Sequence, residues 1–371
     1  MKVPAVDLRA QFEVDEAIYL EAVQEVLRSG RFILGPEVEA LEREIAVLCG
    51  CSYGVGVASG TDALRLSLEA MDIGPGDEVI TSPFTFVATA AAICRAGARP
   101  VFVDVKADTF NLNPWRVEWM VTPRTVAILP VHLFGQMANM GPLLKIAGAH
   151  NLLIIEDAAQ ALAAAYQGEP AGSWGHCACL SFFPTKNLGA AGDGGMVVTD
   201  DAELADALRV LRRQGCRYKY RADRIGFNSR LDELQAAVLR VKLRYLASWT
   251  RRRREIAAYY DMALADLPVR TPAVSQGRTH VYHQYTLRIP DGRRDALQAW
   301  LRKQGVAATV YYPVPLHLQP AFAHLGYRLG DFPEAELAAA EVLSIPVYPE
   351  MGDEAMRYVV DMIRWFYEAG E

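Results

Sequence analysis

One lysine, Lys186, stands between an apolar run and a group of glycines. The run 178–183 has the composition of a strand, and the glycines that follow the lysine are Gly189, Gly192, Gly194 and Gly195. Glycines let the backbone bend sharply and pack close to a ligand. A lysine amine can form a Schiff base with a carbonyl, and burial or a cationic neighbour favours its nucleophilic neutral form. The position therefore indicates covalent attachment of a cofactor, although a lone lysine is more often a solvated surface residue.

Two more groups of polar residues follow predicted strands. Ser59-Gly60-Thr61 opens a helix, where hydroxyls, free N–H groups and the helix dipole suit a phosphate; a plain helix cap is the alternative. Asp157 follows the predicted strand 152–155, and its carboxylate could cap a helix or hold a pyridine nitrogen protonated. Ligands of open α/β sheets bind at the carboxyl ends of strands. A phosphate cradle, a carboxylate and a lysine are together what pyridoxal phosphate requires.

The elements that must position these residues alternate along the chain. Short apolar runs alternate with helical stretches from Tyr53 to Glu156, which predicts a mainly parallel sheet covered by helices. Two helices, over 14–29 and 36–49, precede this region, and helical patterns over 202–214 and 229–260 follow it. Later segments predict strands over 281–289 and 307–312 and helices over 293–304, 333–342 and 353–368. We therefore expect a large domain over 1–250 and a smaller α/β domain over 251–371.

Composition excludes several classes of protein. The 371 residues carry a net charge of -6, and the run Arg251 to Arg254 reads as a solvated helix face, so a nucleic-acid partner is not expected. The first residues lack an export signal, and no window approaches a membrane span of about 18 apolar residues. The six cysteines lack the spacing of common zinc sites, which favours free thiols, no metal and a reducing cytoplasm.

An ordered set of motifs resembles the DegT/StrS family of sugar aminotransferases over nearly the whole chain, from residue 6 to 349. The resemblance implies the α/β fold of aspartate aminotransferase-like, fold type I transferases that use pyridoxal 5'-phosphate: a large domain with a mainly parallel mixed sheet, and a smaller C-terminal domain. The motifs that carry it are Ser59-Gly60-Thr61-Asp62-Ala63-Leu64, Gly76-Asp77-Glu78-Val79-Ile80, Pro83-Phe84-Thr85-Phe86, Val131-His132-Leu133-Phe134-Gly135, Glu156-Asp157-Ala158-Ala159-Gln160, Ser181 to Lys186-Asn187, and Gly226-Phe227-Asn228-Ser229-Arg230-Leu231-Asp232.

The resemblance also implies a role for each matching cofactor residue. Lys186 matches the lysine that forms the aldimine with the cofactor and then moves the substrate proton. Asp157 matches the partner of the pyridine nitrogen, and Gln160 the residue beside the phenolic oxygen of the ring. Phe86 matches the aromatic that stacks on the ring, although plain core packing is the alternative. The phosphate contacts are Gly60, Thr61 and Ser181, with Asn228 reaching in from the second subunit of a homodimer.

The activity implied is transfer of an amino group from L-glutamate, through the pyridoxamine form of the cofactor, to a keto sugar on a nucleoside diphosphate. Lysine at position 186 argues against the family branch that carries histidine there and dehydrates. The residues of segments 56–64 and 311–319 look most like those of family members that aminate the third carbon of the sugar, which favours a 3-keto sugar. A 4-keto sugar, a keto cyclitol and a non-catalytic, cofactor-binding regulator are the alternatives. Substrate contacts are expected from Tyr312, His317 and Arg230, with packed roles as the alternative for the histidine.

Three positions depart from the pattern common in the family. Gln214 stands where histidine is frequent, Ala222 where another histidine is common, and His176 where aspartate is usual. We expect these positions to border the substrate rather than the cofactor. The departures therefore leave the identity of the substrate open and do not affect the cofactor.

Overall fold

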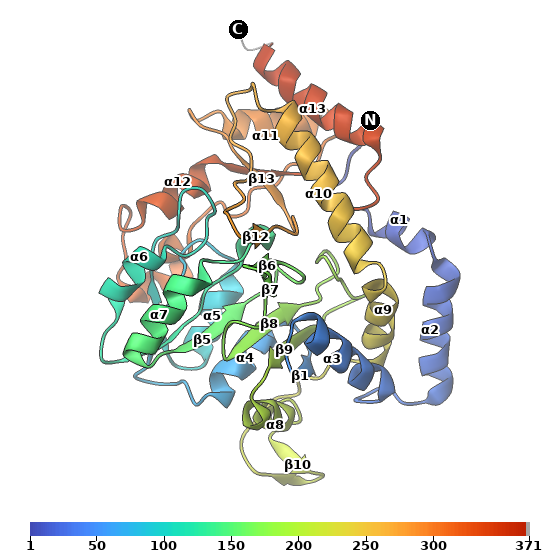
Figure 1. Ribbon diagram of the computed structural model, residues 1–371, viewed down its shortest axis with the longest axis vertical. Coiled ribbons are helices and arrows are strands. Elements are labelled where there is room, and N and C mark those ends of the chain that lie inside the picture. Colours follow the sequence, from blue (N-terminus) through green and yellow to red (C-terminus); the bar gives the residue numbers. More distant parts are fainter. Residues whose placement is uncertain (369–371) are drawn as a thin grey trace.

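The computed structural model describes residues 1–368 and has a seven-stranded sheet at its centre (Figure 1). Only β9 runs antiparallel to its neighbours, while the other pairings in the sheet are parallel, so the mainly parallel mixed sheet is confirmed. In spatial order its strands are β1 (Tyr53–Val57), β9 (Gly195–Thr199), β8 (Cys177–Ser181), β5 (Leu153–Asp157), β4 (Thr125–Ile128), β2 (Glu78–Thr81) and β3 (Arg99–Phe102).

Helices cover both faces of this sheet. Neighbouring strand residues point to opposite faces, so Ile154 and Ile155 of β5 enter two different hydrophobic clusters. One cluster includes residues of α4 (Gly60–Ala70), α5 (Val87–Arg95) and α8 (Ala202–Leu211). The other includes residues of α3 (Pro36–Leu48), α7 (Met140–His150) and α9 (Glu233–Leu243). The carboxyl ends of the parallel strands stay free of these layers and can hold the site.

The C-terminal third forms a separate core above the sheet (Figure 1). Helix α10 (Leu246–Ala263) leads into it, and β13 (Tyr285–Arg288) pairs antiparallel with β14 (Val342–Ile345). Helices α11 (Arg294–Lys303) and α13 (Asp353–Glu368) complete this core, whereas α12 (Pro333–Glu341) packs in another cluster with Phe102 of β3. Val3 pairs with Val306 and packs into this core, so the first residues of the chain join its last third. Because α10 runs through residue 250, the expected domain boundary stays a prediction.

Several predicted elements differ from the structure. The helix expected over 14–29 is α2 (Glu16–Ser29), preceded by the short α1 (Leu8–Glu13). The long helical region 229–260 is divided between α9 and α10. The strand expected over 307–312 was wrong, because only Thr309 pairs there, by a single bridge to Ser344. Strand β9 was missed because glycines precede its short apolar run.

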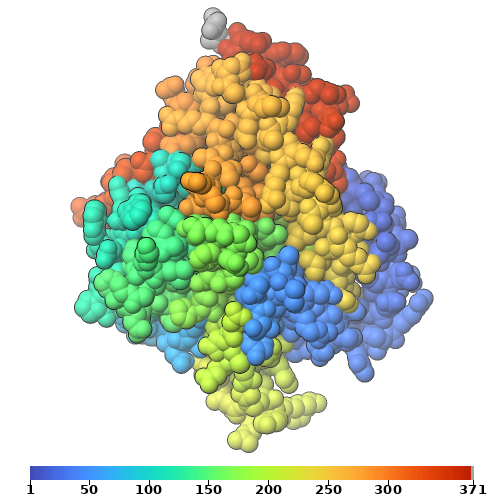
Figure 2. Space-filling view, viewed as in Figure 1, coloured from blue at the N-terminus to red at the C-terminus, as the bar shows by residue number. Residues whose placement is uncertain are grey.

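The remaining elements are short. A three-stranded sheet contains β12 (Arg278–Thr279), β6 (Ala165–Tyr166) and β7 (Glu169–Pro170), and α6 (Pro114–Val117) lies beside α7. The hairpin of β10 (Cys216–Tyr218) and β11 (Arg221–Ala222) projects from the lower end of the molecule (Figure 2). All six cysteines are free. Of the helices within residues 1–368, none has the length and apolar character needed to cross a membrane.

Candidate active site

Asp157 ends strand β5 with its carboxylate buried. The hydroxyl of Thr89 donates to Oδ2 at 2.8 Å, and the N–H of Ala159 donates to Oδ1 at 3.2 Å. Burial raises the pKa of Asp157 above its ordinary value, although these hydrogen bonds and the nearby charge of Lys186 oppose the rise. A buried carboxylate in this state is stabilised by a cationic partner, which a protonated pyridine nitrogen would supply.

Lys186 lies in the loop after β8, where its own N–H donates to the carbonyl of Phe183 at 2.8 Å. Its side chain keeps part of its surface open to the cleft, but protein atoms surround the amine closely enough that burial lowers its pKa to about 8. The charge of Asp157 opposes this shift. Near pH 8 a large share of the amine is therefore neutral and nucleophilic.

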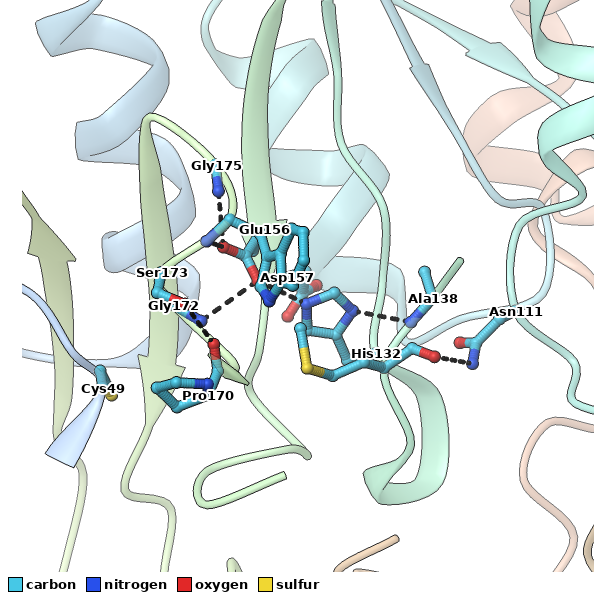
Figure 3. Close-up of polar contacts among 12 residues, drawn as sticks. Cys49, Asn111, His132, Ala138, Glu156, Asp157, Pro170, Gly172, Ser173 and Gly175 are labelled. Atoms are coloured by element: carbon cyan, nitrogen blue, oxygen red, sulfur yellow. Dashed lines mark hydrogen bonds and ion pairs between the residues drawn. The ribbon is translucent and has the colours of Figure 1, made fainter. Parts of the chain in front are cut away.

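Behind Asp157 lies a fully buried pair, Glu156 and His132 (Figure 3). Nε2 of His132 is 2.8 Å from Oε2 of Glu156, and Nδ1 accepts the N–H of Ala138 at 3.2 Å. Because Nδ1 accepts, the proton of the neutral ring is on Nε2 and points at the carboxylate. Glu156 accepts further backbone N–H groups, which come from Gly172, Trp174 and Gly175.

Backbone hydrogen bonds fix the peptide that carries the carboxylate of Asp157. The N–H of His132 donates to the carbonyl of Asp157 at 3.0 Å, and the N–H of Asp157 donates to Pro130 at 2.9 Å. His132 is thus the packed, hydrogen-bonded histidine that a strand end often holds. Its place beside Asp157 makes it a positioning residue.

The start of α4 holds Gly60 and Thr61, the residues for which phosphate contacts are predicted. Ser59 is the helix cap, since its hydroxyl accepts the N–H of Asp62 at 3.1 Å, and Thr61 remains exposed. A Cβ atom at Gly60 would stand 2.7 Å from Cβ of Ser181, and one at Gly195 only 2.4 Å from the backbone of Ser59. Glycine is therefore needed for β8 and β9 to come this close to the helix N-terminus, where the dipole favours a phosphate.

Three expected residues meet on the side of the small domain. The Phe86 ring is 55% exposed, and its centroid lies 6.3 Å from that of Tyr312. Nε2 of Gln160 donates to the hydroxyl of Tyr312 at 3.0 Å, while Oε1 accepts the N–H of Phe134 at 2.7 Å. An exposed aromatic face at the start of α5 is available for stacking on a flat ring.

Other expected contacts lie apart from this group. His317 is 2% exposed, with Nε2 at 2.9 Å from Oε1 of Glu336, so the structure favours the packed role for it. Asn228 is exposed and Arg230 is partly exposed, and Ser229 between them donates to Asp62 at 2.6 Å. Contacts of these residues with a substrate or a second subunit stay predictions.

One expectation about charge was wrong. The run Arg251 to Arg254 was expected to be a solvated helix face, but Arg253 is 4% exposed. Its neighbours on α10 lie at the surface or partly so. The helical period turns one of the four arginines toward the core. Because the four residues are identical, the sequence does not indicate which of them is buried.

The assembled residues fit pyridoxal phosphate. The carboxylate of Asp157 is buried, burial lowers the pKa of the Lys186 amine to about 8, and Gly60 opens a helix N-terminus beside Ser181. In the same range, no cluster of three or more His, Cys, Asp or Glu side chains could hold a metal ion. Sequence reasoning missed Thr89 and the pair behind Asp157. The signal that could have indicated Thr89 is its position in the first turn of α5, one turn after Phe86.

Comparison with known proteins gives the same assignment. The model of the DegT/DnrJ/EryC1/StrS aminotransferase family matches residues 14–364. A relative from Geobacillus stearothermophilus named a pleiotropic regulatory protein is 53% identical, with 99% of each chain covered. UDP-N-acetyl-3-dehydro-alpha-D-glucosamine 3-aminotransferase from Acidithiobacillus ferrooxidans is 46% identical over 98% of this chain and 97% of its own.

Solved structures agree over the same length. The crystal structure of DesV from Streptomyces venezuelae in complex with a ketimine intermediate has a TM-score of 0.96 and 46% identity, and the match covers 99% of each chain. NtdA from Bacillus subtilis, solved with bound PMP cofactor, has a TM-score of 0.92 and 32% identity, covering 100% of this chain and 86% of its own.

Proposed function

Because the chain belongs to the DegT/DnrJ/EryC1/StrS aminotransferase family, we propose that it moves the amino group of L-glutamate to a 3-keto sugar carried by a nucleoside diphosphate. The chain is a transaminase that uses pyridoxal 5'-phosphate. The observation that carries the proposal is the buried amine of Lys186, which lies within the electrostatic reach of Asp157 at the strand ends. The sugar, its third carbon and the donor belong to the proposal.

The chain's own residues divide the work. Bound in this site, pyridoxal phosphate supplies an electron sink for the carbon that loses a proton. Asp157, oriented by Thr89 and by the N–H of Ala159, keeps a negative charge buried opposite the pyridine nitrogen. Nζ of Lys186 would take the proton from the donor's carbon and deliver it to the reactive carbon of the cofactor, and a pKa of about 8 suits both roles near neutral pH.

The other residues bind and orient. The N-terminus of α4, with Gly60, Thr61 and Ser181, holds the phosphate group. The exposed ring of Phe86 would be available to cover one face of the pyridine ring, and Gln160, whose Oε1 accepts the N–H of Phe134, would lie beside the phenolic oxygen. Tyr312 closes the cleft from the small domain and excludes water from the reacting atoms.

The acceptor rests on similarity to named relatives. The relative from Acidithiobacillus ferrooxidans is a 3-aminotransferase of a nucleotide sugar, and a transaminase from Streptomyces venezuelae is named for a 3-amino sugar on dTDP at 46% identity. A 3-keto nucleotide sugar is therefore favoured over a 4-keto sugar or a keto cyclitol. We further propose a homodimer in which the exposed Asn228 of one copy reaches the phosphate of the other.

A second candidate is a regulator that binds the cofactor without turnover. It is favoured by the 53% identity to the protein named a pleiotropic regulatory protein. Against it stands the intact pair of Asp157 and Lys186, because a regulator without turnover has no use for a lysine amine whose pKa is lowered to about 8. The two candidates differ in turnover, which one experiment measures.

The test is an absorbance assay in two steps. Purified holoenzyme is treated with L-glutamate, which should remove the absorbance band of the pyridoxal form, and the donor is then washed out. A panel of 3-keto and 4-keto nucleotide sugars and keto cyclitols is added, and we expect a 3-keto nucleotide sugar to restore the band. Restoration by a cyclitol alone would overturn the acceptor class. No loss of the band with any amino acid would favour the regulator.

A further inference from the structure

The residues on either side of Asn228 are held by side chains from the start of α4. The hydroxyl of Ser229 donates to Oδ2 of Asp62 at 2.6 Å. One turn further along the same helix face, Cζ of Arg65 lies 4.0 Å from the centre of the Phe227 ring. Two successive turns of α4 therefore contact the two neighbours of Asn228.

Ser229 also contacts the end of the chain segment that leads into this helix. It is 0% exposed, and its hydroxyl oxygen accepts the N–H of Ala58 at 3.2 Å. The next residue, Ser59, caps α4 by accepting the N–H of Asp62 at 3.1 Å. One buried hydroxyl therefore bridges the residue before the cap and the first turn of the helix. The phosphate contacts are proposed for this same turn.

Backbone hydrogen bonds hold the other side of the segment. The N–H of Phe227 donates to the carbonyl of Leu211 at 2.7 Å, and the N–H of Ser229 donates to that of Arg212 at 3.1 Å. Both carbonyls belong to the C-terminal end of α8. Asn228 lies between these two attachment points and is exposed. Its backbone is therefore held within the chain, while its side chain is open to contact from outside.

The charge of Asp62 is unfavourable for a phosphate at this place. The residue lies in the first turn of α4, where a carboxylate interacts favourably with the helix dipole but competes with an anion bound at the same N-terminus. The hydrogen bond from Ser229 gives the carboxylate a different use. An ionised acceptor makes a stronger hydrogen bond than a neutral one, so Asp62 holds Ser229 firmly.

We propose that Asp62 is a positioning residue for the cofactor phosphates of both subunits of the homodimer. Through Ser229 it holds segment 226–230 against the α4 N-terminus that binds the phosphate of its own subunit, so that Asn228 of this segment reaches the phosphate of the second subunit. The inference rests on the proposed function, which includes the homodimer and the contact of Asn228. Cofactor binding and dimer formation should then strengthen each other, because linkage between two binding equilibria is reciprocal.

The first experiment measures by calorimetry how pyridoxamine 5'-phosphate binds to cofactor-free protein. This probe carries the phosphate group but no aldehyde, so Lys186 cannot bond to it covalently. In Asp62→Ala the dissociation constant should rise about 10-fold, the effect of losing one hydrogen bond to a charged group. Asp62→Asn keeps an acceptor for the Ser229 hydroxyl and should stay within about threefold of wild type. Asp72→Asn removes an exposed carboxylate just beyond α4 and is the matched control, which should bind as wild type does.

The two variants of Asp62 separate its position from its charge. If the residue acted through its charge alone, both variants would bind the probe more tightly than wild type, because each removes a negative charge near the phosphate. Equal or tighter binding in Asp62→Ala would therefore overturn the proposal. Equal weakening in Asp62→Ala and Asp62→Asn would overturn it as well, since the amide retains the acceptor.

A second variant, Ser229→Ala, removes the same hydrogen bond from its other partner and covers the case in which Asp62→Ala does not fold. It should weaken binding of the probe by a similar factor. Combining the two changes should add less than about twofold, because both remove one interaction. Fully additive losses would contradict the link between the two residues.

Sedimentation velocity over a range of protein concentrations gives the dimer dissociation constant with and without the probe. Pyridoxamine 5'-phosphate should lower this constant in wild type and in Asp62→Asn, and the change should be about 10-fold smaller in Asp62→Ala. An equal effect of the probe on the dimer in all three proteins would show that the segment is held without Asp62, which would overturn the proposal.

These readouts separate the inference from the proposed function. If L-glutamate never removes the pyridoxal band but Asp62→Ala binds the probe more weakly, the donor assignment falls and the positioning role remains. If L-glutamate reacts normally and Asp62→Ala binds the probe as wild type does, the proposed function remains and the positioning role falls. Wild type that stays monomeric with the probe bound would overturn the homodimer on which the inference rests.

Discussion

The residues packed around Asp157, which we call the Asp157 wall (Glu156, His132 and Thr89), differ from the β10–β11 hairpin in burial. The wall is enclosed within this single chain, whereas much of the hairpin is exposed. At the wall, Glu156 and His132 are fully buried, and each polar group described there has a partner. On and just beyond the hairpin, Tyr220 is 92% exposed and Ile225 is 91% exposed. Asp157 and its neighbours are thus held by contacts within one chain, whereas the hairpin leaves large side chains exposed.

The largest expected effect comes from removing the amine of Lys186, which lies near Asp157. Lys186→Ala should lower transamination by about 10 000-fold or more, because the proton on the donor's carbon loses both its base and its acid. The measurement is single-turnover absorbance of the loaded enzyme with L-glutamate. Turnover within a factor of ten of wild type would show that another group moves the proton.

The second largest effect concerns the pair behind Asp157. His132→Ala removes the imidazole donor to the buried carboxylate of Glu156, which should lower the free energy of unfolding by about 1.5 to 3 kcal/mol, the cost of losing a hydrogen bond to a charged group. Urea unfolding of the cofactor-free protein gives this value. His150→Ala, at a partly exposed position, is the control and should change it by less than about 0.5 kcal/mol. Equal stability of both variants would mean that the pair is not a structural support.

A third prediction concerns pH. The folded pKa of Lys186 is about 8 and the ordinary value is 10.5, so between these values the folded protein binds fewer protons than the unfolded chain. Burial of Lys186 therefore costs stability in full below pH 8, and the cost fades as the pH rises to 10.5. Lys186→Met should be more stable than wild type at pH 7 by on the order of 3 kcal/mol, and the difference should shrink toward pH 10.5.

Urea unfolding of both cofactor-free proteins across this range is the measurement. Subtracting the two curves removes the contributions of other groups, including Lys242, whose pKa burial also lowers to about 8. A difference that stays constant with pH would show that the amine is not desolvated.

The smallest expected effect concerns the exposed β10–β11 hairpin. Tyr220→Ser should change the free energy of unfolding by no more than about 0.5 kcal/mol, because an exposed ring loses little packing. The rate of the L-glutamate half-reaction should stay the same. A loss above about 2 kcal/mol in thermal or urea unfolding would show that the ring is covered, and the contrast with the Asp157 wall would then disappear.

The amino-acid sequence alone determined the fold class and the cofactor, while the residues that hold the cofactor stay predictions. Strand and helix periods are local, Asp157 ends a strand, and Gly60 and Lys186 follow strands, so their place at one edge of the sheet follows from the architecture. The acceptor stays a proposal, because its contacts come from exposed segments such as Asn228 that no local pattern positions.

Only the tertiary structure decided which side chains are buried together. Nothing in the run Arg251 to Arg254 marks Arg253 as the residue turned inward, and nothing near His132 points to Glu156, 24 positions away. Such pairings depend on long-range packing, where the burial of a charge is set by residues distant in the chain. The sequence therefore placed the candidate cofactor residues at the strand ends, and the packed structure decided which side chains are buried beside them.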